Sequence, residues 1–189
     1  MKQKIFFLSL LLTSTFFPNK KLIAQEYFTK NGSISFFSKA SLENISADNN
    51  QVISLLNTQS GTLRFYLLVN AFHFSKAMME EHFNSDYMES DKYPSASFKG
   101  VIDNIVSIDA GKDATYQVTV TGTLEIHGVS KGVTTAGTVT VKAGIISATS
   151  VFKIQLKDYN IKIPSIVVNN IAEEIEVTLN CRYQKRTSN

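Results

Sequence analysis

The chain has 189 residues, the size of a single domain that can bury a substantial hydrophobic core. It contains 19 Lys and Arg residues and 16 Asp and Glu residues, but four of the lysines lie before residue 22, in a stretch without acidic residues. The remaining chain therefore has 15 basic and 16 acidic residues and is nearly neutral. Nucleic-acid binding requires clustered positive charge, so this class of function is disfavoured.

The first 24 residues have the organisation of a secretory signal peptide. Two lysines precede an almost wholly apolar run from Ile5 to Phe17, and Ala24 provides a small residue at the cleavage edge. The run is shorter than the roughly 18 to 20 residues that cross a bilayer. We therefore expect a signal peptide at residues 1–24 and one domain at residues 25–189. The mature protein is expected to be periplasmic or secreted, with no stable membrane anchor.

Alternation of apolar and polar residues dominates the rest of the sequence and predicts half-buried antiparallel strands. In chain order these stretches are 62–69, 95–102, 115–126, 133–141, 150–156 and 174–183. Clusters of turn-forming residues predict turns at 48–50, 57–61, 109–113 and 142–144. Many short strands at this spacing favour a single closed barrel or sandwich.

One segment departs from this alternation. Four of its apolar residues recur near the helical spacing, namely Phe74, Met78, Met79 and Phe83. This pattern predicts a short amphipathic helix near residues 75–84. Such a helix would pack over the sheet or close one end of a barrel.

The only cysteine, Cys181, excludes a disulfide within the chain. It is in phase with Val177 and Leu179 on the apolar side of a predicted strand. A free cysteine in this position behaves as a small hydrophobic residue. We therefore expect Cys181 to be buried, with a reactive thiol as the alternative.

The stretch GTLEIHGVSKG, residues 122–132, contains the pattern G-x-S-x-G, which in many hydrolases positions a nucleophilic serine, here Ser130. That role requires a helix after the serine and a mostly parallel sheet. Here a strand rich in threonine and valine follows instead. We interpret the stretch as a hairpin in which Gly128 and Gly132 adopt backbone angles denied to other residues.

Glu125 and His127 are two residues apart, so both would project from the same face of a strand. That arrangement suits acid–base catalysis or half of a metal site. The other histidines, His73 and His82, lie in the helical segment without an H-E-x-x-H pattern. We expect no metal site and no cofactor, and we expect His127 to tie down the hairpin through a ring nitrogen. An exported enzyme that uses His127 and Glu125 remains the alternative.

Three stretches resemble the YceI-like family. HFNSDYMESDKYPSASFKG (82–100) resembles its block with Tyr-Pro and Phe-Lys, and VTGTLEIHGVSKGVT (120–134) resembles its signature G-x-L-x-I-H-G-V-[TS]-K-x-V. LKDYNIKIP followed by EIEVTL resembles its closing segment. The motif residues include Tyr93, Pro94, His127, Gly128 and Lys131. The resemblance implies a mainly β fold, a single antiparallel lipocalin-like β-barrel of about eight strands, in an exported protein that binds lipid or polyisoprenoid.

An eight-stranded barrel has an interior just wide enough for its own side chains or for one slim ligand. The apolar phase of the strands predicts the lining: Phe65, Val118, Val120, Leu124, Phe152, Ile154, Val177 and Leu179. A long isoprenoid tail would gain about 25 cal/mol per Å² of apolar surface buried there, without any charged contact. We therefore expect a non-enzymatic carrier of an isoprenoid or a similar apolar lipid. A filled barrel that acts through a protein partner is the other alternative.

Overall fold

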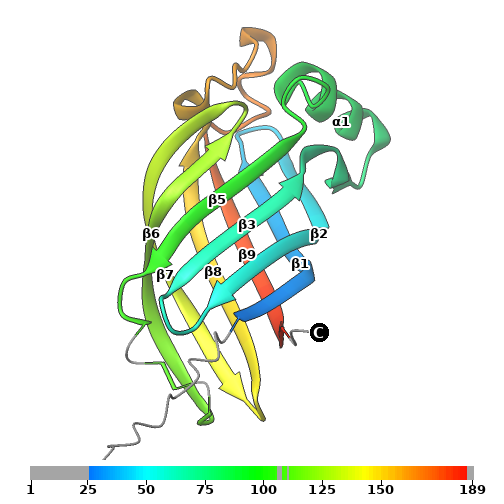
Figure 1. Cartoon of the computed structure of the whole chain (residues 1–189). Helices are drawn as coiled ribbons and strands as arrows, with labels where there is room; N and C mark the ends of the chain where they lie inside the picture. The colour runs from blue at the N-terminus through cyan, green and yellow to red at the C-terminus, as the bar shows by residue number, and fades with distance from the viewer. Residues whose placement is uncertain (1–25, 106–107, 110, 187–189) are drawn as a thin grey trace, which may run out of the picture.

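The chain folds into a closed antiparallel β-barrel (Figure 1). The computed structural model describes residues 26–105, 108–109 and 111–186, so the predicted signal peptide lies outside the described residues. The strand order is β1-β9-β8-β7-β6-β5-β3-β2-β4, and β1 also pairs with β2. That additional pairing closes a barrel of eight long strands, and the two-residue β4 extends the sheet beside β2. The predicted lipocalin-like barrel of about eight strands is confirmed.

The strands alternate in direction around the barrel. Their bounds are β1 Glu26–Lys39, β2 Asn44–Asn57, β3 Thr62–Leu68, β4 His73–Phe74, β5 Ser95–Ile102, β6 Ala114–Ile126, β7 Val129–Lys142, β8 Ile145–Gln155 and β9 Glu174–Lys185. Each predicted strand falls within one of these elements or overlaps it closely. The alternating burial along β6 and β9 shows why: inward apolar residues alternate with outward polar ones.

The predicted helical segment is present and slightly displaced. Helix α1 spans Ala77–His82 and continues into one π-helical turn, η2, over Phe83–Tyr87. Short 3-10 turns occupy Val69–Ala71 (η1), Leu156–Tyr159 (η4) and Ser165–Val167 (η5). Helix α1 and the segment between β8 and β9 lie at the same end of the barrel, here named the α1 end (Figure 1). Within the described residues, no helix is both long enough and apolar enough to cross a membrane.

The predicted turn at residues 48–50 is wrong, because β2 runs through it. The pairing of β1 with β2 shifts register between Gly32 and Ile34, which marks a bulge at this point. Buried Asn49 satisfies the irregular backbone: its side-chain amide donates to the Leu68 carbonyl oxygen (2.9 Å), and its amide oxygen accepts from the Gln51 N–H (2.9 Å). The asparagine that suggests a turn in the sequence thus stabilises a bulge.

The hairpin between β6 and β7 is tighter than predicted. Ile126 pairs with Val129, so His127 and Gly128 alone form the loop. Their φ values are 53° and 71°, as a two-residue type I′ turn requires. Gly132 has no such role: it pairs with Thr123 within the sheet, so the prediction of an unusual backbone angle there is wrong.

The half of the barrel remote from α1 is filled with side chains. Its buried core consists of Tyr27, Leu56, Leu63, Phe98, Ile102, Ile105, Val118, Val120, Val139, Val141, Ile146, Cys181 and Tyr183. The Tyr183 hydroxyl shares a 2.8 Å hydrogen bond with the Ser54 hydroxyl inside this core. Cys181 is fully buried, as predicted, and burial raises the pKa of its thiol to about 12. This packed half supports the open half toward α1.

Candidate functional site: a cavity at the α1 end

The α1 half of the barrel encloses a cavity of about 440 Å³. That volume is within the range of roughly 300 to 1,000 Å³ that is typical of small-molecule sites. The cavity reaches inward to Leu63, Phe98 and Val120, which also belong to the packed core and form its floor. The barrel is thus hollow toward α1 and filled toward the other end, and an entirely filled interior is excluded.

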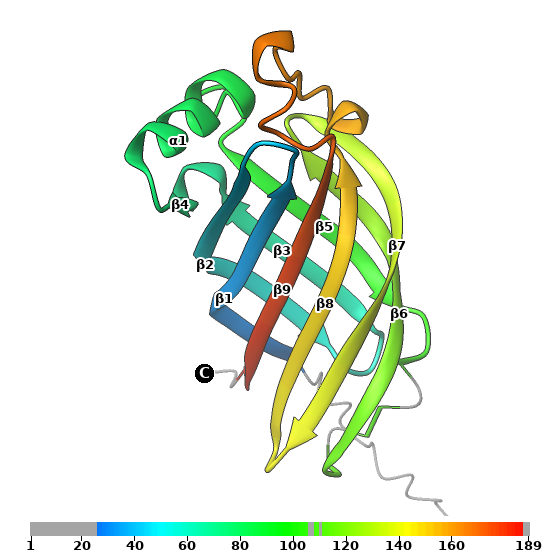
Figure 2. The ribbon, with the colours of Figure 1, turned by 180° about the vertical axis from the view of Figure 1, so that it is seen from behind.

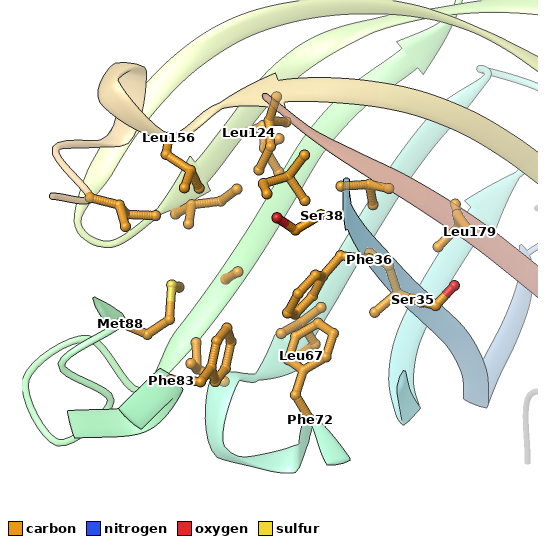
Figure 3. A pocket seen from close by; sticks show the side chains of 18 of the residues that line it. Ser35, Phe36, Ser38, Leu67, Phe72, Phe83, Met88, Leu124, Leu156 and Leu179 are labelled. Atoms are coloured by element: carbon orange, nitrogen blue, oxygen red, sulfur yellow. The ribbon is translucent and has the colours of Figure 1, made fainter. Parts of the chain in front are cut away.

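The cavity wall is built from aliphatic and aromatic side chains (Figure 3). Seven of the eight predicted lining residues lie on it: Phe65, Val120, Leu124, Phe152, Ile154, Val177 and Leu179. Val118, the eighth, lies one inward position below Val120 on β6, within the packed core. Alternation identifies the inward face of a strand but not the depth at which the interior becomes open, and this explains the difference.

An aromatic cluster that the sequence analysis missed forms one side of the cavity. Phe36 on β1 stacks on Phe83 of η2 with ring centroids 5.6 Å apart. Phe72 and Phe74, between β3 and α1, pack against both rings at centroid distances of 5.0 to 5.7 Å. The four rings pack the segment that contains α1 and η2 against the barrel wall. The helical spacing of Phe74 and Phe83 is visible in the sequence, but their partner Phe36 is on a strand 38 residues earlier than Phe74.

The cavity floor depends on two glycines opposite each other in the sheet. Gly100 on β5 pairs with Gly122 on β6. A Cβ atom on either glycine would lie within 2.6 Å of the Phe98 ring. The absence of side chains there leaves space for the ring, which lies across both strands and covers the packed core beneath.

In one part of the cavity wall, the neighbouring strands β7 and β8 are not joined by backbone hydrogen bonds. The strands β7 and β8 pair only from Lys142 and Ile145 to Thr138 and Thr149, and Figure 2 shows β7 curving away from β8 beyond that point. The parts of β7 and β8 that do not pair with each other contribute residues to the cavity lining, including Val133, Thr135, Ser150 and Phe152. The Ser150 hydroxyl donates to the Ala136 carbonyl oxygen (2.7 Å) where the ladder ends.

The mouth of the cavity is formed where three loops meet. Glu43, directly before β2, accepts a hydrogen bond of 2.8 Å from Lys76, which precedes α1. This hydrogen bond holds the pKa of the Glu43 carboxyl below its ordinary value, and a bond from the Asn170 side chain adds to the effect. The Leu42 N–H also donates to the Asn169 carbonyl oxygen (3.0 Å). These contacts connect the β1–β2 turn to α1 and to the β8–β9 segment.

His127, in the stretch 120–134 that resembles the family signature, holds the α1 end of the barrel together. His127 is buried, with its Nε2 atom 2.9 Å from Glu89 Oε2 and its Nδ1 atom 3.1 Å from the Tyr159 carbonyl oxygen. The Tyr93 ring packs on His127 at a centroid distance of 4.3 Å and also covers Gly128. We name His127, Glu89 and Tyr159 the histidine latch. As predicted, His127 ties down the hairpin, and it does so by binding two distant segments.

The other motif residues have backbone or surface positions. The Pro94 carbonyl oxygen accepts from the Val69 N–H (2.9 Å), which fixes the entry into β5. Lys131 is exposed on β7, opposite Leu124 in the ladder. Neither residue lines the cavity, so the motif residues form its frame.

Of the residues considered for catalysis, Ser130 and Glu125 meet, but His127 has other partners. Glu125 is exposed and accepts a 3.3 Å hydrogen bond from the Ser130 hydroxyl, whereas His127 faces Glu89. The prediction that Glu125 and His127 share a face is wrong, because the positive φ at His127 ends the strand alternation. Within the described residues, His, Cys, Asp and Glu form no group of three or more that could hold a metal ion.

Comparisons with known proteins agree with this architecture. Residues 25–183 match the family model of the YceI-like domain. A polyisoprenoid binding domain from Saccharophagus degradans, implicated in plant cell wall breakdown, superposes with a TM-score of 0.75 at 16% identity, covering 86% of this chain and 99% of that one. No curated protein sequence matches the chain.

Two further solved structures share the fold. Burkholderia cenocepacia BcnA gives a TM-score of 0.66 at 19% identity, covering 82% of this chain and 96% of that one. A Campylobacter jejuni YceI protein gives a TM-score of 0.52 at 18% identity, covering 98% of this chain and 100% of that one.

Proposed function

The chain belongs to the YceI-like domain family, and from this premise we propose that it is an exported, non-enzymatic carrier of an isoprenoid or similar amphiphilic lipid. The cavity at the α1 end carries the proposal. Its volume and its aliphatic and aromatic wall suit a flexible hydrocarbon tail, which is held by removal of apolar surface from water. The polyisoprenoid binding domain from Saccharophagus degradans, with the same fold, supports this ligand class.

The positions of the exposed apolar side chains at the mouth support a carrier that exchanges its ligand there. Leu42, Met78 and Ile166 are exposed by 73%, 69% and 90%. Each is next in sequence to a residue that lines the cavity, namely Glu43, Met79 and Val167. An apolar tail that enters between these loops meets apolar contacts before it reaches the interior.

The geometry of the histidine latch supports a binding role rather than catalysis. Both ring nitrogens of His127 are engaged by Glu89 and Tyr159, away from Ser130 and Glu125. In a serine hydrolase a histidine base lies within hydrogen-bond reach of the nucleophile, and here the histidine faces other partners. His127, the base that a hydrolase mechanism would need, therefore stabilises the frame of the cavity instead.

The test is the composition of the purified protein. The full chain is expressed with its own leader in a bacterial host, recovered from the periplasm or medium, and extracted with organic solvent for mass spectrometry. We expect a mature N-terminus near residue 25 and an isoprenoid or related lipid at near-equimolar amount. Protein that carries no lipid, and that takes up none when incubated with isoprenoids, would contradict the carrier function.

A further inference from the structure

Two ion pairs at the α1 end each include a residue that lines the cavity. Lys76 Nζ lies 2.8 Å from Glu43 Oε1, and His82 Nδ1 lies 2.7 Å from Asp86 Oδ2. Glu43 and His82 line the cavity. Even when His82 is protonated, each positive group is matched by a carboxylate, so these pairs leave no surplus of positive charge at the mouth.

Apart from His82, which is paired with Asp86, the described lining carries one carboxylate and no basic side chain. Among the described residues, no lysine or arginine lines the cavity, and Glu43 is its only Asp or Glu. The hydrogen bond from Lys76 lowers the pKa of Glu43, so this carboxyl is ionised at neutral pH. The polar residues Ser35, Tyr87 and Asn170 also line the cavity. These groups exchange hydrogen bonds with a neutral partner.

A phosphate or diphosphate would be disfavoured at this mouth. Tight binding of such groups uses charge-assisted hydrogen bonds from arginine or lysine. Lys76, which contacts the lining residue Glu43, donates one of its N–H bonds to that carboxylate, which balances its positive charge. An anionic headgroup would have to displace the carboxylate or remain beside it, where like charges repel.

We propose that the ligand is an isoprenoid with a neutral headgroup, such as an alcohol, and that Glu43 selects against phosphate and diphosphate esters of the same tail. This inference rests on the proposed function, since it places the tail in the cavity and the headgroup at the mouth. It makes Glu43 a specificity-determining residue.

The test compares two ligands that differ only in the headgroup. The purified, delipidated full chain is titrated with geranylgeraniol and with geranylgeranyl diphosphate by calorimetry at low ionic strength. We expect the alcohol to bind at least tenfold more tightly than the diphosphate. Added salt should narrow this difference, because salt screens repulsion between charges.

Substitutions at the mouth give opposite expected changes. Glu43→Gln removes the carboxylate and releases Lys76, so affinity for the diphosphate should rise at least threefold while affinity for the alcohol is unchanged. Lys76→Gln leaves Glu43 without its cation, so the diphosphate should bind more weakly still. Glu81→Gln is the matched control, because Glu81 is exposed on α1 and does not line this cavity.

The outcomes separate the two proposals. Diphosphate binding as tight as alcohol binding in the unaltered protein would overturn the neutral headgroup and leave the carrier function intact. An unchanged ratio of the two affinities in Glu43→Gln would overturn the role of Glu43. Binding of neither ligand would overturn the carrier function and this inference with it.

Discussion

His127 Nε2 lies 2.9 Å from Glu89 Oε2, although the two residues are 38 positions apart in the chain. The second ring nitrogen contacts the Tyr159 carbonyl oxygen, so one side chain joins the β6–β7 hairpin, the segment after η2 and the turn η4. Glu89 has a φ of 43°, in the left-handed region that residues other than glycine rarely adopt. The histidine latch therefore fixes three segments that surround the cavity.

Substitutions in the histidine latch should lower the stability of the protein. His127→Ala should lower the free energy of unfolding by roughly 1 to 3 kcal/mol, because a buried side chain loses two hydrogen bonds. Glu89→Gln, which keeps an acceptor oxygen, should cost less. Urea denaturation followed by circular dichroism measures both values. A His127→Ala protein as stable as the unaltered one would show that the histidine latch does not hold the α1 end.

The hydrogen bond between Ser130 and Glu125 is exposed, so Ser130→Ala should change the free energy of unfolding by less than about 0.5 kcal/mol. It should also leave ligand binding unchanged. The measurement is a denaturation curve together with an assay on a panel of ester substrates. Esterase activity in the unaltered protein that disappears in Ser130→Ala would contradict the carrier account.

Two glycines of β6 and β7 predict contrasting effects of an added methyl group. At Gly122 a Cβ atom would lie 2.5 Å from the Lys99 carbonyl oxygen and 2.6 Å from the Phe98 ring, so Gly122→Ala should cost roughly 1 to 3 kcal/mol. At Gly132 a Cβ atom would have no neighbour within 4 Å, and Gly132→Ala should stabilise its strand by about 0.5 kcal/mol. Equal effects of the two substitutions in thermal denaturation would argue against this packing of the floor.

Burial of Cys181 predicts a sensitivity to alkaline pH. Its thiol pKa is raised from 9.0 to about 12, so the unfolded chain releases this proton at lower pH than the folded protein. The stability contribution is therefore complete below pH 9 and is lost as the pH rises toward 12. Denaturation at about pH 8 and about pH 10.5, on either side of the unfolded-state pKa, should show a smaller decrease in Cys181→Ala than in the unaltered protein. Native Cys181 should also resist alkylation at the lower pH, and rapid labelling would contradict its burial.

The sequence predicts the barrel better than it predicts the site. Alternation along β6 and β9 depends on local contrast between apolar and polar residues, and it identifies the inward faces correctly. Depth is not a local property: Val118 and Val120 are alike in sequence and both belong to the packed core, and only the closed barrel brings Val120 to the cavity floor. The distinction arises from side chains of other strands.

The contacts at the cavity mouth are the part of the site that the sequence predicts least well. Glu43, Lys76 and Asn170 lie on separate loops, and their proximity depends on how the barrel closes between β1 and β2. The wrong turn prediction at Asn49 has a related cause, because the same side chain that favours a turn also satisfies a bulge within a long strand. Local patterns specify the elements, whereas the tertiary structure assembles the site.

The central claim, that the α1 half of the barrel holds a lipid, is tested most directly by the lipid content of two matched variants. Val120→Phe places a ring in the cavity, and Val118→Phe places the same ring in the packed core. We predict that Val120→Phe loses the extractable lipid found by mass spectrometry in the unaltered protein, with a nearly unchanged melting temperature. Val118→Phe should lose roughly 1 to 3 kcal/mol of stability while its folded fraction keeps the lipid. A protein that never carries lipid, and that is destabilised equally by both substitutions, would contradict the account.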